Sequence, residues 1–221
     1  EGLLFKCGRI RKIGRVDHKD AYLDTYELER ERGITIFSKQ ANFVLGDKQV
    51  TLLDTPGHVD FSAEMERTLQ VLDYAILVVS GADGVQGHTR TLWNLLARYQ
   101  VPTFIFINKM DQDGTDRQDR LTELKRKLSG ECVDFTEAGE EFLEELSMCD
   151  ETVMESYLEN GEITASQIQT LIRERKVFPC YFGSALKLEG VQELLDGLGK
   201  YMDGPVSGTH AEEAFGAKVY K

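Results

Sequence analysis

The sequence lacks the long apolar run that a membrane span requires. No stretch of about 18 consecutive apolar residues occurs in its 221 residues, which excludes a transmembrane helix. The first residues, 1–6, hold no basic segment followed by an apolar one, so we expect no secretory signal here and a cytoplasmic location. No G-x-G-x-x-G motif follows any predicted strand, which excludes a Rossmann dehydrogenase.

Cysteine is scarce, and basic charge is scarcer than acidic charge. No cysteine forms a C-x-x-C pair or lies at zinc-ligand spacing from a histidine, so we expect reduced thiols at Cys7, Cys132, Cys149 and Cys180. The formal net charge of −12 argues against a domain that grips DNA through a broad basic face. Residues 111–175 hold 18 acidic and 7 basic residues, so most of the acidity lies in one region.

Apolar runs alternate with helical patterns along the chain. The runs predict strands over 40–46, 49–54, 74–80, 103–108 and 177–183, and the glycine-containing turn 46–48 makes the first two a β-hairpin. Apolar residues at helical spacing predict helices over 86–98, 116–128 and 189–201. Buried runs that alternate with helices predict an α/β fold with a doubly wound, mostly parallel sheet.

Two segments depart from this alternation. Residues 130–175 are acidic and rich in helical patterns, and we expect a helical insertion there. Residues 203–210 have the Gly, Pro and Ser content of a linker, and the pattern of 214–220 indicates the start of a further strand. We therefore expect a main domain over 1–202, followed by a linker and the first strand of a β-domain over 203–221.

The string Asp54-Thr55-Pro56-Gly57-His58 directly follows the strand 49–54. An aspartate at a strand end can hold Mg²⁺ through water, and a nearby glycine lets a backbone N–H approach a terminal phosphate. Ligands bind at the carboxyl edge of parallel sheets, where this string would lie. The alternative is a plain turn built from Thr-Pro-Gly.

Three other strings carry chemistry only in combination. Asn108-Lys109-Met110-Asp111 follows the strand 103–108, and its carboxylate can accept two hydrogen bonds from guanine; the alternative is a polar loop that caps the next helix. The small residues of Gly183-Ser184-Ala185-Leu186-Lys187 let a backbone N–H reach a base carbonyl, or form only a tight turn. Thr35, in the string R-E-R-G-I-T-I, can ligate Mg²⁺, or belong to a charged, solvated loop.

Together, in this order, these strings resemble the GTP-binding domain of the translational GTPase family. R-E-R-G-I-T-I followed by L-L-D-T-P-G-H-V-D-F is similar to elongation factor G and its relatives, and residues 80–86 and 178–185 are also similar to the tetracycline-resistance ribosomal protection proteins. The resemblance spans residues 1–221 and is loosest over 130–175. It implies a P-loop GTPase fold, GTP or GDP and Mg²⁺ as ligands, and the ribosome as partner.

The resemblance also implies a role for each matching residue. Thr35 and Asp54 would hold Mg²⁺, the Gly57 N–H would sense the γ-phosphate, and His58 would orient the attacking water. Guanine would be read by the loops after two strands, through Asn108, Lys109, Asp111, Ser184, Ala185 and Leu186. Ribosomal RNA near the switch loops would be contacted by the basic side chains of Arg9, Arg11, Lys12 and Arg15, unless these belong to a solvated loop.

The sequence departs from the family pattern at one point. It contains no G-x-x-x-x-G-K-[ST] phosphate loop, and we expect the first strand of the sheet to be missing with it. Nucleotide binding and turnover by this chain should then be weak or absent, and another strand, such as 216–221, would fill the gap in the sheet. Three interpretations remain open: an elongation factor, a ribosomal protection protein, and an inert GTPase-like binding module.

Overall fold

The computed structural model describes residues 1–14, 22–23, 29 and 35–204. The chain divides into two compact units, one drawn from Glu1–Leu72 and Asp203–Lys221, the other formed by Asp73–Met202. Within the described residues, no helix is long and apolar enough to cross a membrane.

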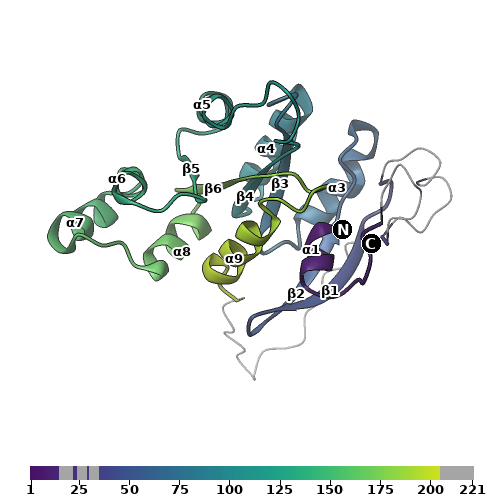
Figure 1. Ribbon diagram of the computed structural model, residues 1–221, viewed down its shortest axis with the longest axis horizontal. Helices are drawn as coiled ribbons and strands as arrows, with labels where there is room; N and C mark the ends of the chain where they lie inside the picture. The colour runs from purple at the N-terminus through teal and green to yellow at the C-terminus, as the bar shows by residue number, and fades with distance from the viewer. Residues whose placement is uncertain (15–21, 24–28, 30–34, 205–221) are drawn as a thin grey trace. The chain divides into compact units, whose positions relative to one another are not determined.

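The second unit is built on a four-stranded parallel sheet (Figure 1). Its strands lie in the order β3 (Ala75–Ser80), β4 (Thr103–Asn108), β6 (Phe178–Phe182) and β5 (Cys132–Asp134). All five residues of β6 are buried, as are the first five of β4, as expected for parallel strands covered on both faces. The three strands predicted in this unit, over 74–80, 103–108 and 177–183, are confirmed to within a residue at each end.

Helices cover both faces of this sheet. Helices α4 (Gly87–Arg98) and α5 (Arg117–Lys127) lie over one face, and α9 (Val191–Tyr201) lies over the other (Figure 1). All three were predicted from apolar spacing, and the Asp116 carboxylate caps α5 by accepting a hydrogen bond from the Asp119 N–H at 2.9 Å. The predicted doubly wound α/β architecture is therefore confirmed.

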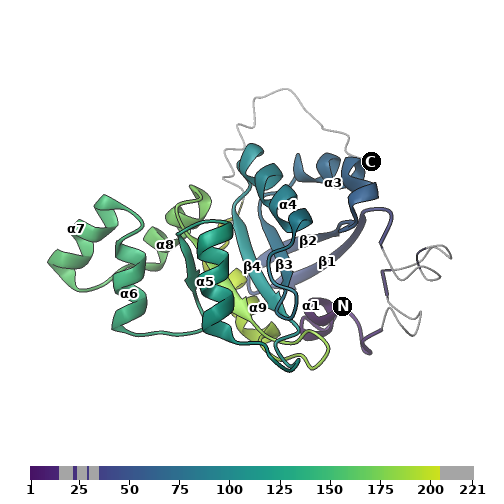
Figure 2. The same ribbon diagram turned by 90° about the horizontal axis from the view of Figure 1, so that it is seen from above.

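The acidic segment contains three helices and one strand that was not predicted. Helices α6 (Glu140–Ser147), α7 (Glu151–Asn160) and α8 (Ala165–Arg173) lie on the side of this unit away from β3 and α4, at the left of Figure 2. Strand β5 pairs with β6 through Cys132 and Asp134, so the main sheet continues into residues that were expected to be wholly insertion. Its three residues are too few to show a periodic pattern.

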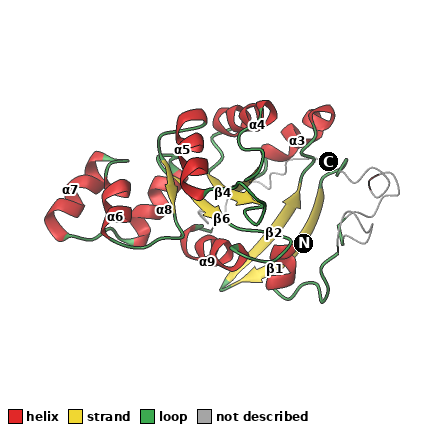
Figure 3. Ribbon diagram, turned by 45° about the horizontal axis from the view of Figure 1, so that its top comes forward, coloured by secondary structure: helices red, strands yellow, loops and turns green. Residues whose placement is uncertain are grey.

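The first unit centres on a β-hairpin of two long strands, β1 (Lys39–Leu45) and β2 (Lys48–Asp54), drawn as arrows in Figure 3. This confirms the predicted hairpin, whose turn contains Gly46 at a φ of 63°. Short α1 (Gly2–Lys6), the 3₁₀ turn η1 (Val59–Phe61) and α3 (Ser62–Leu69) complete the described elements. The apolar core of this unit contains Leu4, Ile10, Leu23, Ala41 and Phe43.

The described strands form two separate sheets. β1 and β2 pair with each other, and β3 pairs with β4 and with no other described strand. Residues 216–221, the segment that we suggested as a filler strand, lie outside the described residues. The linker and further strand expected beyond residue 204 lie there too.

Gly197 in α9 lies close against a side chain of the sheet. A Cβ at this position would overlap the phenol oxygen of Tyr181, a side chain in β6 that is 2% exposed. Alanine at an open helix position stabilises relative to glycine by up to about 1 kcal/mol. At Gly197 the added methyl group would overpack the core, so alanine should destabilise the protein. We expect Gly197→Ala to lower the free energy of unfolding by about 1–3 kcal/mol.

Denaturant unfolding tests this prediction with two comparison variants. Combining Gly197→Ala with Tyr181→Phe removes the nearest clashing atom and should restore part of the lost stability. Gly87→Ala in α4 is the matched control, because a Cβ at Gly87 meets nothing within 4 Å. A Gly197→Ala protein as stable as the Gly87→Ala control would contradict the described packing.

Candidate functional site

The carboxyl ends of β4 and β6 bring two of the predicted strings together. The strands are parallel neighbours, with Ile107 opposite Phe182, so the loops that follow them leave from the same edge of the sheet. The Gly183 N–H donates to the Ile107 carbonyl at 2.9 Å, and the Met110 N–H donates to the Gly183 carbonyl at 3.0 Å. The N-K-M-D and G-S-A-L strings therefore form one structural unit although more than 70 residues separate them.

The side chain of Asn108 joins the two loops directly. Its Oδ1 atom accepts hydrogen bonds from the backbone N–H of Lys109 at 2.8 Å and of Ala185 at 2.9 Å. A single amide oxygen thus holds the start of both loops. Lys109 itself has a φ of 64°, a left-handed conformation that is uncommon outside glycine, and it lies exposed at the surface.

Asp111 is held in its charged form by the second loop. A hydrogen bond from the buried Ser184 hydroxyl lowers the pKa of Asp111, and the Lys187 ammonium, whose Nζ lies 3.3 Å from Oδ2, lowers it further. The Asp111 side chain is only 18% exposed. An ionised carboxylate fixed in this way is an acceptor for a pair of N–H donors on a ligand.

The loop after β6 is closed by glycine on both sides. Ser184 and Glu189 exchange backbone hydrogen bonds at 3.0 Å, which closes the intervening residues into a tight loop. A Cβ on Gly183 would overlap the Glu189 carbonyl, and one on Gly190, which has a φ of 72°, would overlap the Phe182 carbonyl. Leu186 lies in this loop and is 61% exposed.

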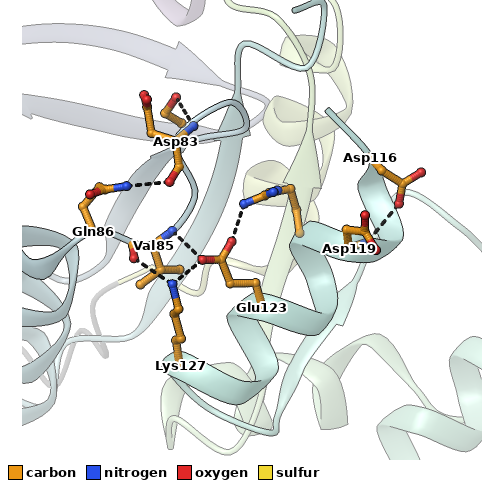
Figure 4. Close-up of polar contacts among 9 residues, drawn as sticks. Asp83, Val85, Gln86, Asp116, Asp119, Glu123 and Lys127 are labelled. Carbon is orange, nitrogen blue, oxygen red and sulfur yellow. Dashed lines mark hydrogen bonds and ion pairs between the residues drawn. The ribbon is translucent and has the colours of Figure 1, made fainter. Parts of the chain in front are cut away.

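A third loop, after β3, packs against the same edge and against α5. The Gly81 N–H donates to the Asn108 carbonyl at 2.6 Å. Further along this loop, the Glu123 carboxylate accepts from the Val85 N–H at 3.3 Å and pairs with Lys127, which donates to the Val85 carbonyl (Figure 4). Burial acts to raise the pKa of Glu123, but these hydrogen bonds outweigh it and the pKa is lowered.

The first unit carries the other predicted residues. Asp54 ends β2, where it pairs in the ladder with Lys39, the first residue of β1. Thr35 lies four residues before Lys39, so it precedes the strand end that pairs with Asp54. A hydroxyl and a carboxylate are the oxygen ligands that Mg²⁺ prefers, and Mg²⁺ is commonly held by one or two carboxylates plus phosphates. The donor set therefore fits this ion.

Gly57 and His58 lie between β2 and α3 and are both exposed. A Cβ on Gly57 would meet nothing within 4 Å, so its backbone is open to approach. The His58 side chain is 50% exposed, and its Nδ1 lies 3.3 Å from the Asp60 backbone nitrogen and 3.4 Å from the Asp60 carboxylate. His58 is thus oriented by its neighbour while its ring faces solvent.

Sequence reasoning missed two contributing residues. Lys187, the last residue of its string, was given no role by the sequence, yet it pairs with Asp111, a partner 76 residues away that no local pattern reveals. Glu29 lies six residues before Thr35 in a charged run whose composition indicates a solvated loop, yet its side chain is fully buried. A lone buried carboxylate in such a run leaves no signal in the sequence.

A parallel sheet with helices on both faces, and polar loops joined at its carboxyl edge, defines a nucleotide-binding α/β domain. The chain belongs to the family of the elongation factor Tu GTP binding domain, whose family model matches residues 1–203. It is therefore a GTP-binding domain of the translational GTPase type. The resemblance drawn from the sequence motifs is confirmed.

Individual relatives agree with this assignment. Tetracycline resistance protein TetP of Clostridium perfringens is 35% identical over a 244-position alignment that covers 100% of this chain and 37% of that protein. A crystal structure of a Thermus thermophilus protein matches with a TM-score of 0.82 at 24% identity, over 92% of this chain and 37% of that one, and shows the same fold. The chain thus spans little more than a third of the length of each.

Ser184→Ala tests the electrostatic coupling of the two loops. We expect the pKa of Asp111 to rise toward its ordinary range in Ser184→Ala, and to rise in Lys187→Gln as well, because both side chains lower it. NMR titration of the Asp111 carboxyl measures both shifts. An unchanged Asp111 pKa in Ser184→Ala would contradict the described contact.

The same variant should change how stability depends on pH. A lowered folded-state pKa contributes stability above the unfolded-state pKa, and this is lost as the pH falls through the folded-state value. The difference in free energy of unfolding between the wild type and Ser184→Ala should therefore be largest at neutral pH and should decrease as the pH is lowered. Denaturant unfolding across this pH range measures the difference.

Proposed function

We propose that this chain is the nucleotide-binding and hydrolysing domain of a ribosome-dependent GTPase. The observation that carries the proposal is the joined pair of loops, in which Asn108 holds the Ala185 backbone and Ser184 and Lys187 hold Asp111 charged. Membership of the elongation factor Tu GTP binding domain family supports guanine as the base.

Guanine recognition follows from the chemistry of these loops. The Asp111 carboxylate accepts from the N1–H and the exocyclic amine of guanine, a pair of donors that adenine does not present. The Lys109 stem covers one face of the base, and the loop Ser184, Ala185 and Leu186 closes over it. Asn108 and Ser184 fix both loops before the ligand arrives. Binding therefore loses little conformational entropy in these loops.

Magnesium and the γ-phosphate are assigned to the first unit. Thr35 and Asp54 would hold Mg²⁺, which neutralises phosphate charge when bound. The Gly57 N–H donates to the γ-phosphate, and the open space at this residue leaves room for that approach. His58 orients the water that attacks, with its ring held by Asp60.

The sequence contains no G-x-x-x-x-G-K-[ST] phosphate loop, so this chain alone should bind nucleotide weakly. We propose that residues 1–202 form the GTP-binding domain, with 130–175 as its insertion and 203–221 as linker and first strand of a β-domain. The ribosome, including RNA near Thr35 and His58, is the proposed partner. The likeness to a tetracycline resistance protein keeps ribosomal protection as the second candidate.

Asp111→Asn tests guanine recognition. An asparagine donates where aspartate accepted, so it repels the guanine amine but suits the carbonyl that xanthine carries there. We expect GDP affinity to fall by about 100-fold or more, because two hydrogen bonds to a charged group are lost, and affinity for xanthosine diphosphate to rise. Fluorescent nucleotide binding with Mg²⁺ measures both, on the chain and on a form extended N-terminally through a phosphate loop.

Asp113→Asn is the matched control, since it makes the same change two residues on at an exposed position. If only the extended form binds GDP, the phosphate loop supplies the missing affinity as expected. If neither form binds GDP, the third candidate, an inert GTPase-like module, replaces the proposal.

His58→Ala tests the hydrolytic role. We expect ribosome-stimulated GTP hydrolysis by the extended form to fall by about 10²–10⁴-fold, the usual contribution of a group that positions or deprotonates the nucleophile. GDP affinity should be unchanged, because His58 lies outside the base-binding loops. Single-turnover hydrolysis and fluorescent GDP binding on the same preparation separate the two effects, and equal losses in both would refute this role.

A further inference from the structure

The carboxylate of Glu29 is fully buried in the first unit, with an exposed fraction of 0%. Its Oε1 atom accepts hydrogen bonds from the backbone N–H of Ile36 at 3.0 Å and of Phe37 at 3.1 Å. Its Oε2 atom pairs with the Lys39 ammonium, whose side chain is only 9% exposed. A buried charge of this kind is costly unless it is paired and hydrogen-bonded, and here both conditions are met.

These contacts fix the chain directly after Thr35. The two N–H groups that Glu29 holds belong to the next two residues, so the direction in which the chain leaves Thr35 is set by this carboxylate. The third contact reaches Lys39, which pairs in the hairpin ladder with Asp54. One buried side chain therefore contacts the segment that follows Thr35 and the residue, Lys39, that pairs with Asp54 in the ladder.

Residues 36–39, which follow Thr35, are also held by contacts to helix α3. The Ser38 and Thr68 hydroxyls are 2.8 Å apart and buried, and the Ser38 N–H donates to the Glu64 carboxylate at 3.4 Å. Both partners lie on α3, the helix that follows the segment of Gly57 and His58. Residues 36–39 thus lie between Glu29 and α3.

We propose that Glu29 is a positioning residue, which sets the Thr35 hydroxyl relative to the Asp54 carboxylate for magnesium binding in the GTP state. This inference rests on the proposed function of Thr35 and Asp54. Glu29 is not itself a ligand, because one oxygen is taken by two N–H groups and the other by Lys39. Partners that orient metal ligands typically contribute about 10–100-fold to metal affinity.

Two double variants separate positioning from the buried ion pair. Glu29→Ala with Lys39→Met removes both the charge pair and the acceptor for the two N–H groups. Glu29→Gln with Lys39→Met removes the same charges but keeps an amide oxygen that can accept from Ile36 and Phe37. Both proteins lose the same two charges, and only the glutamine variant keeps an acceptor for the backbone after Thr35; the alanine variant also loses the side-chain volume at this buried site.

Amide hydrogen exchange in the nucleotide-free chain gives the first readout. We expect exchange at Ile36 and Phe37 to speed up at least about tenfold in the alanine double variant, and to stay near wild type in the glutamine one, since a lost hydrogen bond costs about 1–1.5 kcal/mol. Equal exchange in the two variants overturns the proposal. This readout needs no nucleotide, so it does not depend on the proposed function.

The magnesium concentration for half-maximal GTP hydrolysis in the extended form gives the second readout. It should rise about tenfold in the alanine double variant and remain within a few-fold of wild type in the glutamine one. GDP affinity should be the same in both, because Thr35 is assigned to the triphosphate state. An unchanged magnesium requirement, in a protein that binds GDP and responds to Asp111→Asn, overturns the inference while leaving the proposed function intact.

Two further variants serve as a charge control and as a substitute for a double variant that does not fold. Asp47→Asn, at the exposed hairpin turn of the same unit, removes one negative charge far along the ladder from Asp54 and should leave both readouts unchanged. If the alanine double variant fails to fold, Glu29→Asp keeps the charge but draws the carboxylate back by one methylene. It should then show the faster exchange and the higher magnesium requirement, and wild-type behaviour would overturn the proposal.

Discussion

The parallel pairing of β4 with β6 is the constraint on which the proposed base-binding edge depends. Parallel neighbours end at the same edge, so the residues that follow each strand meet without any further folding of the loops. Asn108 uses this proximity by accepting one hydrogen bond from its own loop and one from the other. Without the shared edge, neither Asp111 nor Ser184 would have a partner across the gap in sequence.

In both units, buried or half-buried carboxylates hold loops in place through hydrogen bonds and ion pairs. Asp111, Glu123 and Glu29 each accept hydrogen bonds from another segment and each pair with a lysine. In each case burial acts to raise the pKa of the carboxyl, but its hydrogen-bond donors and its lysine partner outweigh this effect and lower the pKa. The strongly acidic composition thus includes a small internal set of carboxylates that hold loops in place, distinct from the acidic helical insertion.

The sequence motifs singled out residues of the two joined loops, but not the contacts that hold these loops together. Asn108, Asp111 and Ser184 were identified because continuous apolar strands precede their strings, and family-specific wording supported them. Lys187 and Glu29 were not, because their roles depend on contacts made across the fold. Helix α3 was missed because its sequence, S-A-E-M-E-R-T-L, is largely polar, and β5 because three residues show no period.

The contact between Gly183 and Gly190 has a consequence for how this domain can diverge. Neither position has room for a Cβ, so both ends of the loop after β6 are restricted to glycine. The exposed tip, which includes Leu186, meets no such steric restriction. Substitutions that accumulate over evolution can therefore gather there and change its outward chemistry, while the backbone path through Ser184 and Ala185 is inherited unchanged.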